Sequence, residues 1–510
     1  MKHFLIMLSL SLMLFTACKE KAIKSNDGAI EQPIISADTI KAIDTSRKIV
    51  PPTEEEMKAM IKQSMLRIHK SAGRVVAKTI FKNVTIVNAK KEALRHNMAI
   101  VVETERIQDI VQVSKLSEKY LAEATIVDLK GAYVIPGLID SHVHYTTAYS
   151  KNTHEANNHA KLNRQIYSGI TGVRDMWGDG RAAAQLARET YMNEINAPDF
   201  FFSAMMSGPS MFQQSGNAYD NEFSFAGYGS KRGKSPWAQK ITAETNIPLA
   251  VAMAKGTGAT GIKLYEDFTK ELANAIIKEA KKQGIATWCH SQLYPASPFD
   301  VLEATTVSHI GNIARFFVAK NKEELLHDDP SNYDNVDITS LPEFKKYVKS
   351  AVKANTIVEP TICLYTMKDS LNEYGYPPTF RGTSPTKEIG SKMVAALHDA
   401  GVPIVAGTDK FAKANEQFPM LFSELESFVK LSKMTPGEAI ISATINAAKS
   451  LKKQDEFGSI EVGKYANLMF TEKNPLEDIE NLKTVVLTTK RGKQFYRKDY
   501  THQFKTNNFN

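Results

Sequence analysis

The chain has 510 residues, of which 43% are hydrophobic and 24% are charged, a composition typical of a globular protein with a large core. That composition excludes a disordered chain, a collagen-like chain and a multi-span membrane protein. Lys and Arg number 64 against 56 Asp and Glu, so the formal net charge is only +8, and no basic run marks a nucleic-acid surface. Three cysteines are too few for a disulfide framework or a cysteine-rich zinc module.

Residues 1–18 have the order of a secretory signal peptide. Lys2 precedes an apolar run that ends at Phe15, and small residues follow. The run is too short to span a membrane. Leu14–Cys18 resembles the lipobox of bacterial lipoproteins, which implies a lipid anchor at Cys18 and a place in the cell envelope, outside the cytoplasm. An ordinary signal peptide with a buried cysteine is the alternative.

Residues 19–72 are expected to form a polar tether and an N-terminal helix. The stretch 19–52 is polar and has few aromatic residues, as in a flexible linker. Thr53 and Glu56 have the spacing of a capping box and follow two prolines. We therefore expect a helix from Thr53 to about Lys70.

Short alternating stretches near both ends of the chain predict β-strands. Residues 79–87, 98–102 and 124–129 indicate a small antiparallel unit. Alternation returns at Phe457–Phe470 and Lys483–Tyr496. The simplest architecture is a composite β-sandwich domain, residues 73–135 and 457–500, with a second domain inserted.

The inserted residues, 136–456, alternate apolar β runs with helix-period segments. We expect eight strands, at Tyr133–Ile139, Gly172–Asp175, Phe200–Ser207, Gly261–Tyr265, Ile285–His290, Thr306–Ile310, Thr356–Leu364 and Val402–Asp409. The helical segments include 155–168, 181–195, 270–283, 341–354 and 386–400. Eight β/α units predict an α/β fold, a (β/α)8 TIM barrel, whose reactive groups lie where strands end.

Candidate metal ligands stand at these strand ends. His142 and His144 are two apart on strand 1, so both side chains point to one face and can bind one metal ion. A pair of buried core histidines is the alternative for that motif alone. The ends of four further strands carry Lys263, His290, His309 and Asp409. So many candidate ligands at separate strand ends favour a metal site.

Lys263 is the unusual member of this set. A buried ammonium is costly unless its pKa falls or it is chemically changed. A lowered pKa gives a free amine that can react with carbon dioxide, and the carbamate is an anionic ligand able to bridge two metals. A salt bridge to a barrel acid is the alternative for Lys263 alone. Among the histidines and Asp409 we favour the carbamate.

The chain resembles the amidohydrolase superfamily over nearly everything from Val84 to Lys493. The similarity is carried by Pro136–His144, Gly169–Asp175, Gly261–Tyr265, Ser308–His309, Gly407–Asp409 and Phe457–Leu468. It looks most like the imidazolonepropionase-like and prolidase-like branch. That branch holds a divalent metal pair and hydrolyses amide bonds in dipeptides, cyclic amides or related compounds.

The resemblance implies roles for each candidate. They are His142, His144 and Asp409 for one metal, His290 and His309 for the second, and carboxylated Lys263 as the bridge. The two metals would share a hydroxide nucleophile, and Asp409 would act as general base and acid. Zinc is the default expectation, with manganese, iron or cobalt as alternatives.

Some positions depart from the family. Relatives often have His-Ala-His at strand 5, where this chain has Trp288–Ser291 with only His290. Three long loops, about 208–240, 311–340 and 365–385, are expected to roof the pocket and set specificity. Candidate substrate contacts are Arg315, Tyr365 and Lys410. Arg174 and Asp175, at the end of strand 2, are expected to form an internal ion pair that braces the barrel.

The sequence thus predicts a metal-dependent hydrolase of a C–N bond in a small molecule or dipeptide. The alternatives are lactone or phosphoester hydrolysis, deamination, or a lipoprotein that binds a ligand without turnover. Deaminases of the superfamily often place Glu three residues after the strand 5 histidine, and Leu293 stands there. All six ligand positions are filled, which disfavours a non-catalytic protein. The fold itself leaves the substrate and the oligomeric state open.

Overall fold

The computed structural model describes residues 53, 55–56, 78–146, 154–213, 232–327, 329–365, 386–410, 412 and 415–502. The expected signal peptide, the lipidated Cys18, the tether and most of the helix after Thr53 lie outside these residues. The capping box is among them: the Glu56 N–H donates to Thr53 Oγ1 at 3.2 Å, and the Thr53 N–H donates to Glu56 Oε2 at 2.8 Å. None of the described helices is long and apolar enough to cross a membrane.

Seven parallel strands form most of a barrel and confirm the predicted fold class. In spatial order they are β6 (Leu138–Val143), β7 (Ile170–Asp175), β8 (Asp199–Ser207), β11 (Gly261–Leu264), β12 (Ala286–His290), β13 (Thr306–Ser308) and β14 (Ile357–Glu359). The short strands β9 (Lys234–Ser235) and β10 (Ala238–Lys240) extend this sheet beside β8.

The eighth expected strand closes the barrel although it forms only one β-bridge, between Ile404 and Val358. On one side, the Val358 N–H donates to Pro403 O and the Val405 N–H donates to Val358 O, both at 2.9 Å. On the other side, the Ser141 N–H of β6 donates to Ala406 O at 3.0 Å. The segment therefore joins the last strand to the first.

Strand 7 is shorter than predicted. The expected run Thr356–Leu364 is a strand only over Ile357–Glu359, and the 3₁₀ helix η6 occupies Ile362–Leu364. The reason is the backbone of Thr361, whose φ of 52° lies in the left-handed region and ends the extended conformation.

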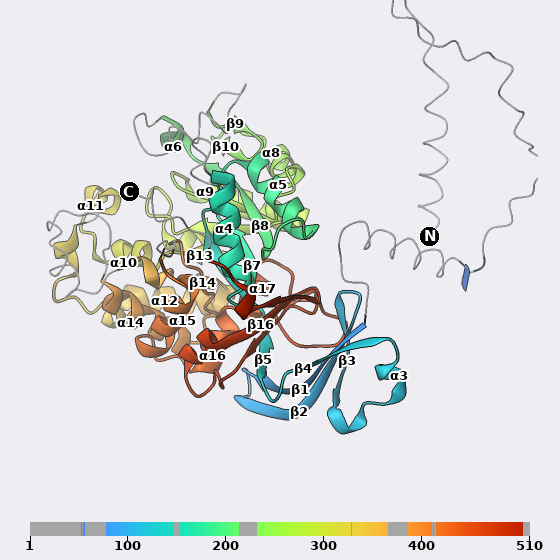
Figure 1. Cartoon of the computed structure of the whole chain (residues 1–510). Helices are drawn as coiled ribbons and strands as arrows, with labels where there is room; N and C mark the ends of the chain where they lie inside the picture. Colours follow the sequence, from blue (N-terminus) through green and yellow to red (C-terminus); the bar gives the residue numbers. More distant parts are fainter. Residues whose placement is uncertain are drawn as a thin grey trace, which may run out of the picture. The chain divides into compact units, whose positions relative to one another are not determined.

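Helices surround the barrel strands (Figure 1). They are α4 (His154–Ile166), α5 (Gly180–Tyr191), α8 (Ile247–Gly256), α9 (Lys270–Gln283), α10 (Ile310–Val318), α12 (Pro342–Ala354), α14 (Lys387–Asp399), α15 (Leu421–Lys430), α16 (Pro436–Ser442) and α17 (Ile445–Ser450). The shorter α3 (Glu118–Leu121), α6 (Pro209–Gln213) and α11 (Lys322–Leu326) lie in connections.

Helix α9 illustrates why these segments are helical. The Thr269 side chain caps its first turn by accepting from the Leu272 N–H, and Gly284, with φ of 76°, ends it. Its buried residues recur three and four apart, at Ala273, Ile276, Ile277 and Ala280. This spacing gives the helix one apolar face that packs on the barrel.

A second, mixed sheet combines strands from both ends of the chain, drawn blue and red in Figure 1. Its order is β17 (Lys493–Tyr496), β16 (Val485–Lys490), β15 (Leu468–Thr471), β5 (Tyr133–Pro136), β1 (Lys78–Asn88), β2 (Ala93–Glu103) and β3 (Arg106–Gln112), with β4 (Ala124–Asp128) also beside β1. The β-rich part of the chain therefore depends on segments more than 300 residues apart.

The details of this sheet correct three expectations. Strands β4 and β5 run parallel to β1, so a purely antiparallel unit was wrong. The run Tyr133–Ile139 is divided at Gly137 between the two sheets. Residues 457–467 form no strand except a bridge from Tyr465 to Arg106, because Phe457 packs against Phe201 of the barrel instead.

Buried charges join the mixed sheet to the barrel. Arg491, in the turn between β16 and β17, is only 3% exposed, and its Nη1 lies 2.9 Å from Asp199 Oδ1. Its Nη2 donates to Tyr191 O at 2.8 Å. The neighbouring Lys490 is fully buried; its Nζ lies 3.6 Å from Asp199 Oδ1 and donates to Thr190 O at 2.6 Å. Two cations of the sheet thus converge on one carboxylate of the barrel.

We predict that Asp199→Ala lowers the free energy of unfolding by about 3–5 kcal/mol, because both cations would stay buried without that carboxylate. Urea denaturation measures the change. The matched control is Glu194→Ala, which removes the partner of Arg188 from a pair whose side chains are 58% and 44% exposed. That exposed pair should contribute less than about 1 kcal/mol. Equal losses in the two variants would contradict the assigned role of Asp199.

Lys490 gives a pH-dependent prediction. Burial lowers its pKa to about 7 from the usual 10.5, so between these values the unfolded chain binds a proton that the folded chain does not. Stability should therefore rise with pH through this window, by up to about 1.4 kcal/mol per pH unit for this proton. Urea denaturation between pH 7 and pH 9 should show a steeper rise for the parent than for Lys490→Met. Parallel curves would mean that Lys490 remains charged when buried.

Candidate metal centre

The six predicted ligands meet at one mouth of the barrel. His142 lies in β6, Lys263 in β11 and His290 in β12, whereas His144, His309 and Asp409 directly follow β6, β13 and the closing segment. A cavity of about 160 Å³ opens between them. Its lining residues are His144, Met176, Trp177, Lys263, Tyr265, His290, His309 and Asp409. His142 is fully buried behind this wall.

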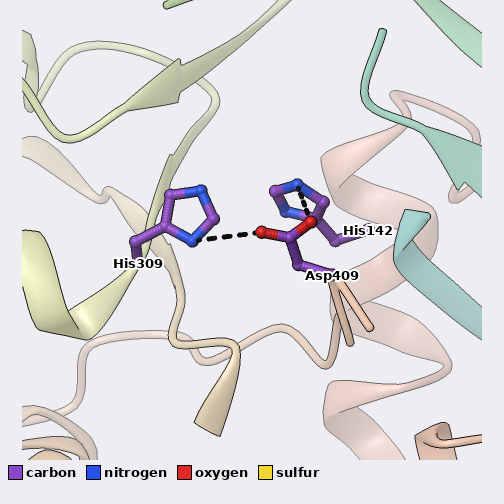
Figure 2. Close-up of side chains that lie close together, drawn as sticks. All are labelled: His142, His309 and Asp409. Atoms are coloured by element: carbon purple, nitrogen blue, oxygen red, sulfur yellow. Dashed lines mark ion pairs between the residues drawn. The ribbon is translucent and has the colours of Figure 1, made fainter. Parts of the chain in front are cut away.

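Asp409 stands at the centre of the cluster. Figure 2 shows its carboxylate between the rings of His142 and His309. Oδ1 lies 3.6 Å from His142 Nε2 and 3.2 Å from His144 Nε2, and Oδ2 lies 3.8 Å from His309 Nδ1. One ligand atom each from His142, His309 and Asp409 lie within 4.8 Å of one another, a spacing that one metal ion can bridge.

Lys263 and His290 complete the ring of side chains. Lys263 is 2% exposed, and its Nζ lies 3.5 Å from His142 Nε2. The His290 ring is 4.8 Å from the His309 ring, centroid to centroid, and equally far from Tyr265. All six residues named from the sequence therefore lie around one cavity.

Two of these residues have an unusual backbone. His309 has φ of 71° and Asp409 has φ of 48°, the left-handed region that residues other than glycine rarely adopt. Hydrogen bonds hold both: the His309 N–H donates to Glu359 O and the Asp409 N–H donates to His142 O, each at 2.8 Å. Such strain is typical of functional sites, where surrounding structure holds it in place.

The electrostatics of the mouth suit a cation. Burial lowers the pKa of His142 and His290 well below the usual value, and that of His309 to about 4, so these imidazoles are neutral. Burial also raises the pKa of Asp409, but His142 and His144 outweigh it and hold this pKa well below its usual range. Neutral imidazoles around a carboxylate are the donors that zinc and related divalent ions prefer.

Burial lowers the pKa of Lys263 to about 8, with Asp409 acting in the opposite direction. Near neutral pH a larger share of its amine is therefore uncharged than for an exposed lysine. An uncharged amine is the form that can add to carbon dioxide. The geometry and charge of Lys263 thus fit a carbamate ligand.

Asp140 is a residue of this site that the sequence analysis missed. Its Oδ1 accepts from the Thr408 N–H at 3.1 Å and its Oδ2 from the Thr408 hydroxyl at 3.0 Å. Burial raises the pKa of Asp140 to about 7. Because Asp409 follows Thr408, these bonds set the position of a predicted ligand. The signal was available, since Asp140 and Thr408 both lie in the motifs that carry the family resemblance.

Arg174 and Asp175 have structural partners, as expected, but do not pair with each other. The Arg174 guanidinium forms an ion pair with Glu359 of β14 and donates to Ser141 O. The Asp175 carboxylate accepts from the Tyr145 N–H at 2.7 Å and the Trp177 N–H at 3.2 Å. Arg174 therefore braces the barrel interior, and Asp175 fixes the turn next to His144.

The predicted substrate contacts lie outside the described wall of the cavity. Tyr365 packs in the hydrophobic core, and its hydroxyl accepts from the Gly311 N–H at 2.7 Å. Arg315 donates to Asn312 Oδ1 at 3.4 Å. Lys410 is exposed and donates to Cys363 O at 3.4 Å. The wall is formed instead by three side chains that the sequence analysis did not assign to it: Met176, Trp177 and Tyr265.

Comparisons with known proteins agree with this geometry. Residues 133–495 match the amidohydrolase family. An imidazolonepropionase from Fusobacterium nucleatum is 26% identical over 400 residues, which are 74% of this chain and 85% of that protein. Two solved structures share the fold with a TM-score of 0.62. A prolidase complexed with N-methylphosphonate-L-proline is 21% identical and covers 82% of this chain and 100% of its own; the A. niger ochratoxinase is 20% identical and covers 83% and 96%.

We predict that Thr408→Val lowers the free energy of unfolding by about 1–3 kcal/mol, because it leaves a buried oxygen of Asp140 without its partner. It should also weaken metal binding, since Asp409 follows directly; calorimetric titration measures this. The control is Thr306→Val, which removes an equally buried hydroxyl that has no hydrogen-bond partner in the described structure. The control should not lose stability, because the hydroxyl that it removes makes no hydrogen bond in the described structure. Similar effects in both variants would remove Thr408 from the site.

Proposed function

This chain belongs to the amidohydrolase family, and from that premise we infer that it is a metal-dependent hydrolase of carbon–nitrogen bonds. One observation carries the inference: neutral imidazoles, the carboxylate of Asp409 and the amine of Lys263 surround a single cavity at the barrel mouth. This is the end of a TIM barrel at which reactive groups lie.

We propose that the mouth holds two divalent ions. The residues that would hold them are His142, His144 and Asp409 for one ion, His290 and His309 for the other, and Lys263 as the bridge. Lys263 would act as a carbamate: its neutral amine forms a bond to carbon dioxide and loses a proton, which converts a buried cation into an anionic ligand. Zinc suits these donors, and manganese, iron and cobalt are alternatives.

Bound divalent ions supply a water of lowered pKa and polarise the substrate carbonyl. The remaining chemistry belongs to the chain. Asp409 is ionised and lies at the cavity, so it can accept the proton of the attacking water and return it to the leaving nitrogen. The wall beside the scissile bond would be formed by Trp177, Met176 and Tyr265, which would exclude bulk water.

The proposed substrate is an amide, a cyclic amide or a dipeptide. Support comes from what similar proteins are named for: imidazolonepropionase in sequence and prolidase in structure. Leu293 three residues after His290 disfavours deamination. We further propose that the enzyme acts in the cell envelope through a lipid anchor at Cys18, which the lipobox-like Leu14–Cys18 supports.

We predict about two metal ions per chain in protein prepared with bicarbonate, and the loss of at least one in Lys263→Ala. Elemental analysis of the purified protein measures both. Acetate or propionate should restore part of the metal content of Lys263→Ala, because a free carboxylate can replace the carbamate. Lys410→Ala is the control, since Lys410 is exposed and, among the described residues, donates to the backbone carbonyl of Cys363 near the site. One ion per chain in the parent, unchanged in Lys263→Ala, would instead mean a mononuclear centre.

A further inference from the structure

The segment Glu359–Pro360–Thr361, which begins at the last residue of strand β14, supplies none of the predicted ligands but touches two of them. Its backbone is fixed beside β13: the His309 N–H donates to Glu359 O at 2.8 Å, and the Ile310 N–H donates to Pro360 O at 3.1 Å. Its side chains contact the rings of His142 and His309. The segment therefore stands where it can orient both imidazoles.

Glu359 lies between two donors. Its side chain is fully buried, with one oxygen against His142 Nδ1 and the other against the Arg174 guanidinium. A guanidinium has only donors, so one Glu359 oxygen accepts from Arg174 and the other is placed to accept from His142 Nδ1. The proton of the neutral His142 ring is therefore on Nδ1. This leaves the Nε2 lone pair facing His144, Lys263 and Asp409.

Thr361 has the same effect on His309. Its hydroxyl donates to Pro360 O at 2.7 Å, which leaves the oxygen placed to accept a hydrogen bond from His309 Nδ1, 3.1 Å away. His309 Nδ1 then carries the ring proton, and Nε2 is the atom with the free lone pair. Two different side chains of one segment thus select the same tautomer in two rings.

The close packing at Gly407 is independent evidence that the Glu359–His142 contact is built into the fold. A Cβ at Gly407 would lie 2.8 Å from the His142 Cβ and 3.2 Å from the Glu359 Cδ. Only glycine lets the closing segment pass this pair. The Glu359–His142 contact is therefore held in place by the packing of the closing segment as well as by Arg174.

We propose that Glu359 and Thr361 are positioning residues that hold His142 and His309 with Nδ1 protonated and Nε2 available to a metal ion. The proposal rests on the metal centre inferred above. Partners that orient a ligating histidine typically change metal affinity by 10- to 100-fold when they are removed. These residues would therefore set how tightly the centre holds its metal without touching it.

The test compares Glu359→Gln and Thr361→Val with the parent chain. The amide of Glu359→Gln can donate to His142 Nδ1, which moves the ring proton to Nε2, and Thr361→Val removes the acceptor for His309. In both variants we expect zinc affinity to fall about 10- to 100-fold, measured on metal-free protein by competition with a chromogenic chelator. Thr361→Ser keeps the hydroxyl and should retain the parent's affinity.

The tautomers are read directly from long-range proton–nitrogen NMR spectra of metal-free protein labelled with ¹⁵N-histidine. The parent should show Nδ1-protonated rings for His142 and His309, and Glu359→Gln should shift the His142 signals. Nε2-protonated rings in the parent, or parent-like zinc affinity in a folded Glu359→Gln, would overturn the proposal. A parent that takes up no zinc but shows the expected tautomers would contradict the proposed function instead.

Glu424→Gln is the matched control. Glu424 of α15 is also a fully buried carboxylate, and it accepts from the Ile362 and Cys363 N–H groups at 2.9 and 2.6 Å. It therefore supports the same segment without touching a predicted ligand. The variant should lose thermal stability and keep the parent's zinc affinity, whereas an equal loss of affinity would reduce Glu359 to a general structural role.

Discussion

The candidate metal centre depends on the contact that closes the barrel, where the last β segment meets the first strand. The carboxylate of Asp140 binds both the N–H and the hydroxyl of Thr408, and the Asp409 N–H donates to His142 O. Together with the bond from the Ser141 N–H to Ala406 O, these bonds fix the register of the closing segment against β6. The same bonds that complete the fold therefore bring Asp409, from one end of the barrel sequence, against His142 and His144, from the other. Fold and site are formed by one set of contacts, so the site exists only in the closed barrel.

Burial gives these side chains their chemistry at a cost in stability. Desolvation at the mouth keeps the imidazoles neutral and lowers the pKa of the Lys263 amine, whereas His142 and His144 keep Asp409 ionised against the effect of burial. Left alone, crowded polar groups of this kind are unfavourable in a protein interior. A divalent ion would pair with the lone pairs and the negative charge together, which explains why a sequence would keep them. The left-handed backbone of His309 and Asp409 also costs stability, and such strain is typical of functional sites.

Much of the barrel and all six candidate ligands could be predicted from the sequence, because a strand and the polar residue at its end are local features. Long-range features could not. Strand alternation at residues 124–129 predicted β4 but not its parallel direction, since direction depends on the partner strand. Tyr365 was expected in a loop at the mouth, but the missing side chain of Gly311 leaves room for its ring in the core. Glu359 falls inside the expected strand Thr356–Leu364, but its partner His142 is 217 residues away in the chain.

The residues at the ends of the barrel strands have two different roles. Strands 1, 4, 5, 6 and 8 end in candidate ligands, whereas strands 2 and 7 end in residues that hold those ligands. Arg174 of β7 pairs with Glu359 of β14, and Glu359 in turn contacts His142. These three side chains form a line across the barrel interior from strand 2 through strand 7 to strand 1. Because each is fully buried, none can turn towards water to satisfy a lost partner. A substitution of any one of them must therefore alter the contacts of the other two. The orientation of His142 thus depends on residues of three barrel strands and not on its own strand alone.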